Sequence, residues 1–323
     1  MTGAGLRVAV LDDWEGIARE CADWDSLGAE VEVFAAPIPP AERAARLAGF
    51  DVICAMRERT PFPAELSRAL PRLRLLTTTG PRNAAIDLPA AAAAGVTVCA
   101  TEGRGPATAQ LTLALILAAT RGLVPAALSM REGGWRSVAG PDLDGLTLGL
   151  VGLGRIGAQV AALARPFGMD VTAWSPNLTD ARCTAAGARR AGSLAALLEG
   201  ADVVSLHVVL SRDTRGLIGA AELARMKPGA LLVNTSRAGV VDGPALRAAL
   251  RVGRPAAAAL DVHAVEPAPA DRADRALIDA GRLLLTPHMG YVSRQTFELF
   301  HRQTVEAIAA WAKGAPIRVL VAP

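Results

Sequence analysis

The chain has 323 residues, of which 51% are hydrophobic, and this length and composition allow a large buried core in about two domains and exclude a disordered protein. Its 34 basic and 31 acidic residues give a net charge of +3 and are spread along the chain, so a small molecule is expected as partner rather than a nucleic acid. The four cysteines lie far apart, in a pattern that predicts neither disulfides nor a metal site: Cys21, Cys54, Cys99 and Cys183.

The amino terminus reads MTGAGLRVAVLDDW, which lacks the charged segment and long apolar run of a signal peptide. We therefore expect a cytoplasmic protein whose first apolar run is a strand. The most apolar later stretch, residues 111–119, is well below the roughly 18 residues that span a bilayer. It predicts a buried helix and no membrane association.

Short apolar runs alternate with longer segments of helical period in the first third of the chain. This rhythm is typical of a parallel sheet covered by helices. The predicted strands are residues 8–11, 31–34, 52–55, 75–78 and 96–100.

A second series of six runs follows Gly140 and Pro141 and matches a complete doubly wound sheet. Its predicted strands are residues 146–151, 171–173, 203–206, 230–234, 257–261 and 283–286.

Two long helical segments, 106–130 and 293–313, bracket the second series, so the chain is expected to leave one domain, complete another and return. We predict a dinucleotide-binding domain at 102–288, inserted into a substrate domain made of 1–101 and 289–323. The chemistry is expected in the cleft between the two domains.

The first strand of the second series runs into a Gly-x-Gly-x-x-Gly turn and then a helix over 158–167. Gly152 permits the tight turn, Gly154 lets a pyrophosphate approach the backbone, and Gly157 lets helix and strand pack closely. The following helix N-terminus favours phosphate charge. This motif predicts an NAD or NADP site.

An acidic residue about 20 positions after the motif usually binds the adenosine ribose, but here the next strand ends in Trp174 and Ser175. Loss of that carboxylate removes the repulsion that excludes a 2′-phosphate. No arginine follows immediately, and Arg155 and Arg182 are the candidate helpers. The choice between NAD and NADP stays open.

Three polar segments follow predicted strands: 234–237, 261–267 and 286–290. The carboxyl ends of parallel strands share one sheet edge, where ligands bind. His288 suits the base that exchanges a proton with a hydroxyl, and Glu266 suits the carboxylate that orients it. Arg237 suits a planar 2-oxo carboxylate. These residues predict hydride transfer at C2 of a small 2-hydroxy acid.

Several ordered motifs together resemble the D-2-hydroxyacid dehydrogenase family over nearly the whole chain. They are the Gly152 turn and residues 207–218, 226–229, 234–237, 260–262 and 286–288. The resemblance implies an α/β protein of two doubly wound domains, with a Rossmann domain inserted into a discontinuous flavodoxin-like substrate domain. It also implies D stereochemistry and a catalytic trio of Arg237, Glu266 and His288.

The resemblance further implies a set of cofactor contacts. Arg155 and Ile156 would lie beside the pyrophosphate, and Thr235 and Asp261 on the nicotinamide side. The remaining predicted contacts are Val208, Val209 and Thr214 on the adenosine side, together with Thr108, Ser175 and Ser236.

Residues 78–87 resemble the family loop whose backbone amides hold the substrate carboxylate, so Thr79, Gly80 and Arg82 are predicted to bind substrate with Arg237. The usual Gly-Val-Gly is here Gly80, Pro81 and Arg82. Proline removes one amide donor. Either Arg82 or Asn83 supplies replacement donors, or Arg82 points to solvent; both readings stay open.

Glu266 argues against formate oxidation, because the resembling formate dehydrogenases carry glutamine there. A cofactor-sensing, corepressor-like protein on the same fold is the alternative. In resembling enzymes the apolar helix from Ala107 and the region of Trp135 form a twofold interface, which predicts a homodimer. The R group of the acid and the role of Tyr291, in substrate contact or in packing, are left open.

Overall fold

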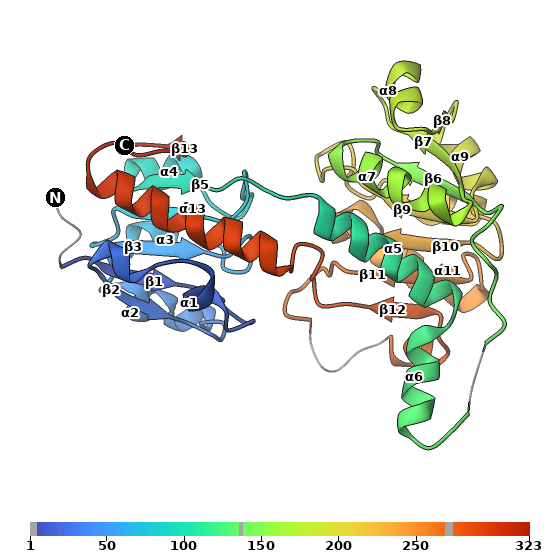
Figure 1. The fold of residues 1–323 in the computed structure, drawn as a ribbon, viewed down its shortest axis with the longest axis horizontal. Coiled ribbons are helices and arrows are strands. Elements are labelled where there is room, and N and C mark those ends of the chain that lie inside the picture. The colour runs from blue at the N-terminus through green and yellow to red at the C-terminus, as the bar shows by residue number, and fades with distance from the viewer. Residues whose placement is uncertain (1–4, 136–137, 269–273) are drawn as a thin grey trace. The chain divides into compact units, whose positions relative to one another are not determined.

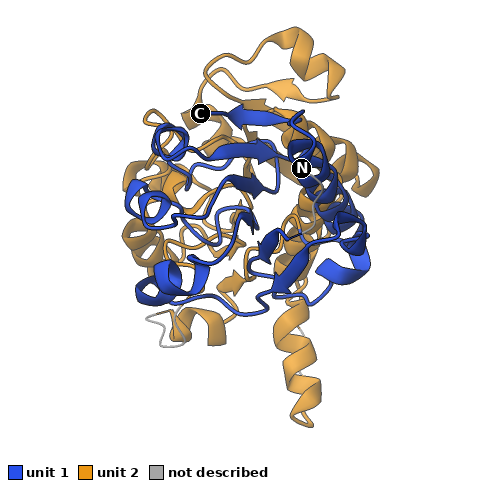
Figure 2. Ribbon diagram, turned by 90° about the vertical axis from the view of Figure 1, so that its left-hand side faces the viewer, with its two compact units in different colours: residues 1–104, 292–323 blue, residues 105–291 orange. Residues whose placement is uncertain are grey.

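The computed structural model describes residues 5–135, 138–268 and 274–323. The chain forms two compact units, coloured separately in Figure 2: unit 1 comprises residues 1–104 and 292–323, and unit 2 comprises 105–291. The predicted domain boundaries lie three residues before each of these crossings. The segment from His288 to Tyr291 therefore belongs entirely to unit 2.

Unit 1 is built on a six-stranded sheet in the order β13-β5-β4-β3-β1-β2, which is the flavodoxin-like order with one added strand (Figure 1). The strands are β1 (Arg7–Val10), β2 (Glu30–Val33), β3 (Val52–Ala55), β4 (Leu75–Thr78), β5 (Thr97–Ala100) and β13 (Val319–Val321). The helices are α1 (Ala18–Cys21), α2 (Arg43–Leu47), α3 (Ala64–Arg68), α4 (Leu88–Ala93) and α13 (Arg294–Ala312), with 3-10 turns η1 (Asp25–Leu27) and η2 (Pro40–Glu42).

The five strands predicted for this unit are confirmed, and all pair in parallel. The sequence analysis missed β13, which pairs antiparallel to β5. Three residues are too few to show a period of two, so this strand depends on its partner rather than on its own pattern.

Both faces of the unit 1 sheet are buried. In β4, Leu75 and Leu76 are fully buried, yet they belong to the apolar clusters on opposite faces. The long helix α13 covers one face and contributes Ala307 and Ile308 to the cluster around Leu75. This double coverage explains why the strands read as continuous apolar runs rather than as alternating ones.

Unit 2 contains a seven-stranded parallel sheet in the order β12-β11-β10-β9-β6-β7-β8, the Rossmann order with one further strand. The strands are β6 (Thr147–Val151), β7 (Asp170–Trp174), β8 (Arg189–Arg190), β9 (Val203–Leu206), β10 (Leu231–Asn234), β11 (Ala257–Leu260) and β12 (Leu283–Leu285). The six predicted strands are confirmed, and the two-residue β8 was missed.

The helices of unit 2 cover both faces of its sheet (Figure 1). They are α5 (Pro106–Thr120), α6 (Leu123–Arg131), α7 (Arg155–Ala164), α8 (Asp180–Ala185), α9 (Leu194–Gly200), α10 (Ala220–Arg225), α11 (Gly243–Val252) and α12 (Arg275–Asp279), with 3-10 turns η3 (Arg165–Phe167) and η4 (Ala238–Val240).

The prediction of one continuous helix over 106–130 is wrong. The helix breaks between α5 and α6 with a bend of 67°. Gly122 sits at the break with φ +57°, a left-handed conformation that ends a helix. Among the described residues, no single helix is long and apolar enough to cross a membrane. Helices α5 and α6 meet that length and apolar character only when they are taken together as this bent pair. Helix α5 packs against α7, β10 and β11.

We predict opposite outcomes for alanine at two glycines of unit 2. A Cβ at Gly149, in the middle of β6, would lie 2.7 Å from Leu197 Cδ2 and 2.8 Å from Ala201 Cβ. Gly149→Ala should lower the free energy of unfolding by about 1–3 kcal/mol because the packed helix cannot withdraw. Gly200→Ala, at the end of α9 where a Cβ meets nothing within 4 Å, should be neutral or stabilise by up to about 1 kcal/mol. Urea unfolding measures both, and equal losses would contradict this packing.

Candidate active site

Two glycines in the turn between β6 and α7 stand where a side chain would clash with the protein's own backbone. Gly152 has φ +104°, and a Cβ there would lie 2.8 Å from the backbone carbon of His207 at the end of β9. A Cβ at Gly157 would overlap the carbonyl oxygen of Gly152. These glycines therefore allow the turn to close and α7 to pack against it.

Gly154 has a different environment. A Cβ placed there would meet no protein atom within 4 Å. Gly154 is also the N-cap of α7, and within the described part of the chain no side chain caps this helix, whereas α9 and α11 are capped by Ser193 and Asp242. Arg155 beside it is exposed and Ile156 is half-buried. The open backbone and uncapped N-terminus fit the pyrophosphate of a dinucleotide.

The segment after β9 carries three predicted adenosine contacts. Val208 is half-buried and Val209 is 74% exposed, so both side chains are accessible to a ligand. The Thr214 hydroxyl instead donates to the Val209 carbonyl at 2.6 Å and accepts from the Ser211 amide at 2.8 Å. The structure thus uses Thr214 to fold the loop that presents the valines.

His207 begins the same segment and does not act as a charged group at neutral pH. Burial lowers its pKa to about 4. Its Nε2 lies 2.9 Å from the Ser205 hydroxyl. A neutral, hydrogen-bonded imidazole beside Gly152 packs the turn.

An asparagine organises the segment after β10. Asn234 Oδ1 accepts from the amide and the hydroxyl of Ser236 at 3.0 and 2.8 Å, and its Nδ2 donates to the Arg237 carbonyl at 3.0 Å. This is the Asx-turn expected for Asn at a chain reversal, a signal that was present in the sequence. Arg237 Nη1 donates to the Ser236 carbonyl at 2.8 Å. The turn therefore fixes where Arg237 leaves the sheet.

Two further predicted cofactor residues face the interior of unit 2. The Thr235 hydroxyl lies 2.9 Å from that of Thr112 on α5, which in turn donates to the Thr108 carbonyl at 2.8 Å. Thr108 and Thr235 are both buried. Thr112, which the sequence analysis missed, ties the end of β10 to the start of α5.

Asp261, directly after β11, is completely buried. Its Oδ1 accepts from the Thr286 hydroxyl at 2.6 Å and from the Met289 amide at 2.9 Å, and its Oδ2 accepts from the Gly290 amide at 2.8 Å. A buried carboxylate requires such donors. Asp261, predicted to contact the nicotinamide, is engaged here in holding the segment that carries His288.

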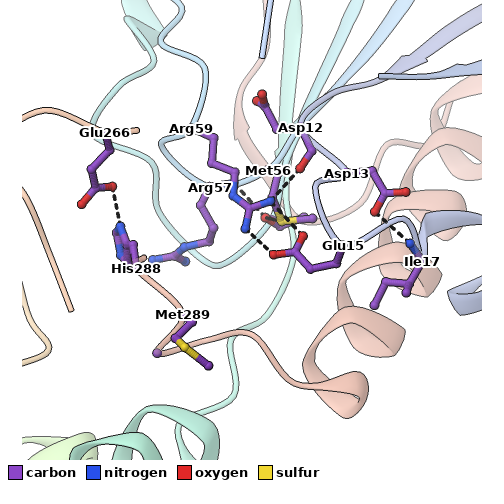
Figure 3. A network of polar contacts seen from close by, with 12 residues as sticks. Asp12, Asp13, Glu15, Ile17, Met56, Arg57, Arg59, Glu266, His288 and Met289 are labelled. Carbon is purple, nitrogen blue, oxygen red and sulfur yellow. Dashed lines mark hydrogen bonds and ion pairs between the residues drawn. The ribbon is translucent and has the colours of Figure 1, made fainter. Parts of the chain in front are cut away.

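Glu266 and His288 form a short side-chain hydrogen bond within the site (Figure 3). Glu266 Oε2 lies 2.6 Å from His288 Nδ1, and Glu266 Oε1 accepts from the His263 amide at 2.8 Å. Burial alone would raise the pKa of Glu266, but the hydrogen bond and charge of His288 outweigh it and hold that pKa below its usual value. The carboxylate is therefore ionised at neutral pH, and the other ring nitrogen of His288 faces away from it.

His288 has φ +54°, a conformation that non-glycine residues rarely adopt. The three bonds to Asp261 and the bond from the His288 amide to the Thr286 carbonyl, at 3.0 Å, maintain it. The Tyr291 ring lies edge-on to the imidazole with centroids 5.8 Å apart. Tyr291, whose role the sequence left open, thus packs against the predicted base.

The predicted substrate loop lies in unit 1, at the end of β4. Two of its side chains bind the backbone of Arg57, which follows β3: Thr79 Oγ1 accepts from the Arg57 amide at 2.9 Å, and the buried Asn83 donates to the Arg57 carbonyl at 2.6 Å. The Gly80 amide donates to Thr101 Oγ1 at 2.7 Å. Arg82 is exposed. Because Asn83 supports the loop, Arg82 is the better placed of the two to offer donors to a ligand.

Unit 1 contains a second polar network, centred on Arg59 (Figure 3). Arg59 donates to both carboxylate oxygens of Glu15, at 3.0 and 2.7 Å, and to the Asp12 carbonyl at 2.6 Å. The sequence analysis did not single out these residues. They tie the ends of β1 and β3 together at the same sheet edge as the substrate loop.

Comparison with known proteins gives concordant results. Residues 113–290 match the family model described as "D-isomer specific 2-hydroxyacid dehydrogenase, NAD binding domain". The D-3-phosphoglycerate dehydrogenase of Bacillus subtilis is 35% identical over 271 residues, covering 83% of this chain and 50% of that protein. The chain thus spans about half the length of the first curated relatives it matches.

Two other similar proteins are covered over most of their length. The glycerate dehydrogenase of Methylorubrum extorquens is 33% identical over 292 residues, covering 88% of this chain and 89% of that protein. A crystal structure of a protein from Ralstonia solanacearum, described as a D-3-phosphoglycerate dehydrogenase oxidoreductase, superposes with a TM-score of 0.91 at 36% identity and covers 98% of this chain and 96% of that one.

The two glycine environments predict a separation of stability from nucleotide binding. Gly154→Ala should leave the free energy of unfolding within about 0.5 kcal/mol, because a Cβ there meets no protein atom. It should weaken NAD(P) binding by about tenfold, since the methyl group occupies the space that a pyrophosphate needs. Gly157→Ala should instead destabilise the protein. Thermal unfolding and calorimetric titration test both, and a folded Gly154→Ala variant with unchanged affinity would contradict the assignment.

Proposed function

Because the chain belongs to the D-isomer specific 2-hydroxyacid dehydrogenase family, we propose that it transfers a hydride between NAD(P) and C2 of a small D-2-hydroxy acid or its 2-oxo acid. The proposed catalytic residues are Arg237, Glu266 and His288. The bound nicotinamide supplies or accepts the hydride. Everything else that the reaction needs is proton transfer and orientation, which the side chains of the chain can supply.

The observation that carries this proposal is the 2.6 Å contact between Glu266 and His288 on the sheet that also bears the glycine turn. Strands β10, β11 and β12 are neighbours in this sheet, and the segments after them carry Arg237, Glu266 and His288 respectively. Parallel strands end at one edge, where ligands of such sheets bind. Arginine suits the anchor for the substrate carboxylate, glutamate suits the counter-ion of the imidazole, and histidine suits the acid.

In the direction of reduction, His288 gives a proton to the carbonyl oxygen of the 2-oxo acid as C2 accepts the hydride. Glu266 stabilises the protonated imidazole beforehand and fixes its orientation through Nδ1. Arg237 offers paired donors to the planar carboxylate and carbonyl. In oxidation the same proton returns from the hydroxyl to His288.

The substrate is proposed to be a small, polar 2-oxo or 2-hydroxy acid. Similar proteins are named for phosphoglycerate, glycerate and hydroxypyruvate, the last being a reductase of Thermotoga maritima. Thr79, Gly80 and Arg82 stay predictions for contacts with the carboxylate. We also propose a cytoplasmic location, with the support of four buried, unpaired cysteines, which suit a reducing compartment.

A homodimer is part of the proposal. Helix α6 extends away from the rest of unit 2 in both views (Figures 1 and 2). It and the segment after it expose large apolar side chains: Leu123, Val124, Leu128, Met130 and Trp135, the last being 89% exposed. Several large apolar side chains exposed on one helix and the segment after it are typical of a contact between subunits.

We expect His288→Asn to lower the rate of 2-oxo acid reduction by about 10²–10⁴-fold, because asparagine cannot deliver the proton. Glu266→Gln should cause a smaller loss, since the imidazole then lacks its counter-ion. The measurement is oxidation of NADH and NADPH, each supplied separately with a panel of 2-oxo acids. Calorimetric titration with the nucleotide serves as the control, since its affinity should not change. Near-wild-type turnover of His288→Asn would refute the assignment.

The dimer proposal predicts that the double variant Leu128→Asp and Met130→Asp runs as a monomer of 33.3 kDa in analytical ultracentrifugation, because two carboxylates from each subunit would be buried at the interface. The wild-type chain should have twice that mass. Val252→Asp is the matched control: Val252 ends α11 and is 83% exposed. The proposal fails if the wild-type chain is monomeric, or if the control dissociates as completely as the double variant.

A further inference from the structure

The end of β7 adjoins the glycine turn directly. Strand β7 pairs with β6 so that Trp174 lies opposite Val151, and the Gly152 amide donates to the Trp174 carbonyl at 2.8 Å. Ser175 is therefore the residue next to the turn, where NAD-specific proteins place the carboxylate that binds the ribose 2′-hydroxyl. The half-buried Ser175 carries no charge that would repel a phosphate.

A guanidinium reaches this place from the next helix. Arg182 on α8 is exposed, and its Nη2 donates to the carbonyl of Leu153 at 3.0 Å. Leu153 stands between the first two glycines of the turn, so the side chain of Arg182 extends from α8 to the pyrophosphate turn. Arginine has five N–H donors in a planar fork, and this single bond leaves donors for a phosphate.

The surrounding charge is positive. Asp180 is the one acidic residue in the sequence from Ser175 to Arg190, and its carboxylate is paired with Arg190 at 3.5 Å. Arg189 and Arg190 form β8, the edge strand beside β7, and Arg155 begins α7 (Figure 1). A dianionic phosphate placed beside Ser175 would meet no unpaired carboxylate from this stretch of chain.

We propose that Ser175 and Arg182 form a subsite for the 2′-phosphate of NADP, so that this chain binds NADP in preference to NAD. The inference rests on the proposed function, because it requires a dinucleotide on the glycine turn. Arg182 supplies paired donors to the phosphate oxygens, and Ser175 leaves room for the phosphate and offers it a hydroxyl.

The test is calorimetric titration of the full chain with NADP⁺ and NAD⁺ separately, at one fixed salt concentration. Wild type should bind NADP⁺ about tenfold or more tightly than NAD⁺. Arg182→Ala should weaken NADP⁺ binding by about that factor and change NAD⁺ binding by no more than about twofold. The variant should remain folded, because the helix cap at this position uses the Arg182 backbone amide and the Thr179 hydroxyl.

Two further variants sharpen the test. Ser175→Asp restores the missing carboxylate and should reverse the preference by repelling the 2′-phosphate. Arg189→Ala is the matched control, since it removes an exposed arginine of the same edge strand while Asp180 stays paired with Arg190, and it should leave the ratio of the two affinities within about threefold of wild type.

The outcomes separate this inference from the proposed function. Binding of both nucleotides without preference, or an Arg182→Ala variant that loses affinity for both equally, would overturn the subsite and leave the dehydrogenase proposal standing. Failure of the wild-type chain to bind either nucleotide would overturn both.

Discussion

The carboxylate of Asp261 is the constraint on which the geometry of the active site depends. It is fully buried and accepts three hydrogen bonds from the segment between Thr286 and Gly290. Removing a carboxylate from water is costly unless donors replace the lost hydration. The segment therefore has one favourable arrangement, and in that arrangement His288 takes its rare backbone conformation and faces Glu266. A residue outside the proposed catalytic trio thus determines where the proposed proton donor stands.

Much of this architecture could be predicted, because the strands of both sheets are buried on two faces and appear as short apolar runs. The strands that escaped prediction, β8 and β13, contain two and three residues and depend on a neighbouring strand. The break after α5 escaped because apolar helical spacing continues through Leu123 and Val124, although the left-handed Gly122 bends the helix axis by 67°. The two strands were missed because a neighbouring strand, rather than their own pattern, determines them, and the helix break was missed because one glycine outweighs the apolar spacing around it.

The candidate site was likewise predicted in part. Arg237, Glu266 and His288 could be singled out because chemically suitable residues followed strands that had to share an edge. The hydroxyl of Thr214 and the carboxylate of Asp261 were expected to face the cofactor; Thr214 binds the backbone of its own loop, and Asp261 binds the segment that follows β12. Residue type and spacing indicate that a donor or acceptor is present. They do not indicate which partner it meets, because that depends on loop geometry.

The discontinuity of unit 1 determines the order in which the chain can complete its structure during synthesis. Helix α13 contributes buried residues, among them Phe297, Phe300 and Ile308, and β13 supplies an edge of the unit 1 sheet. All of these follow unit 2 in the chain. A ribosome has therefore produced every residue of unit 2 while the first 104 residues still lack one covering helix. The nucleotide-binding unit can fold first, and the amino-terminal segment must wait with apolar surface exposed, which makes it the part of the nascent chain most in need of chaperone protection.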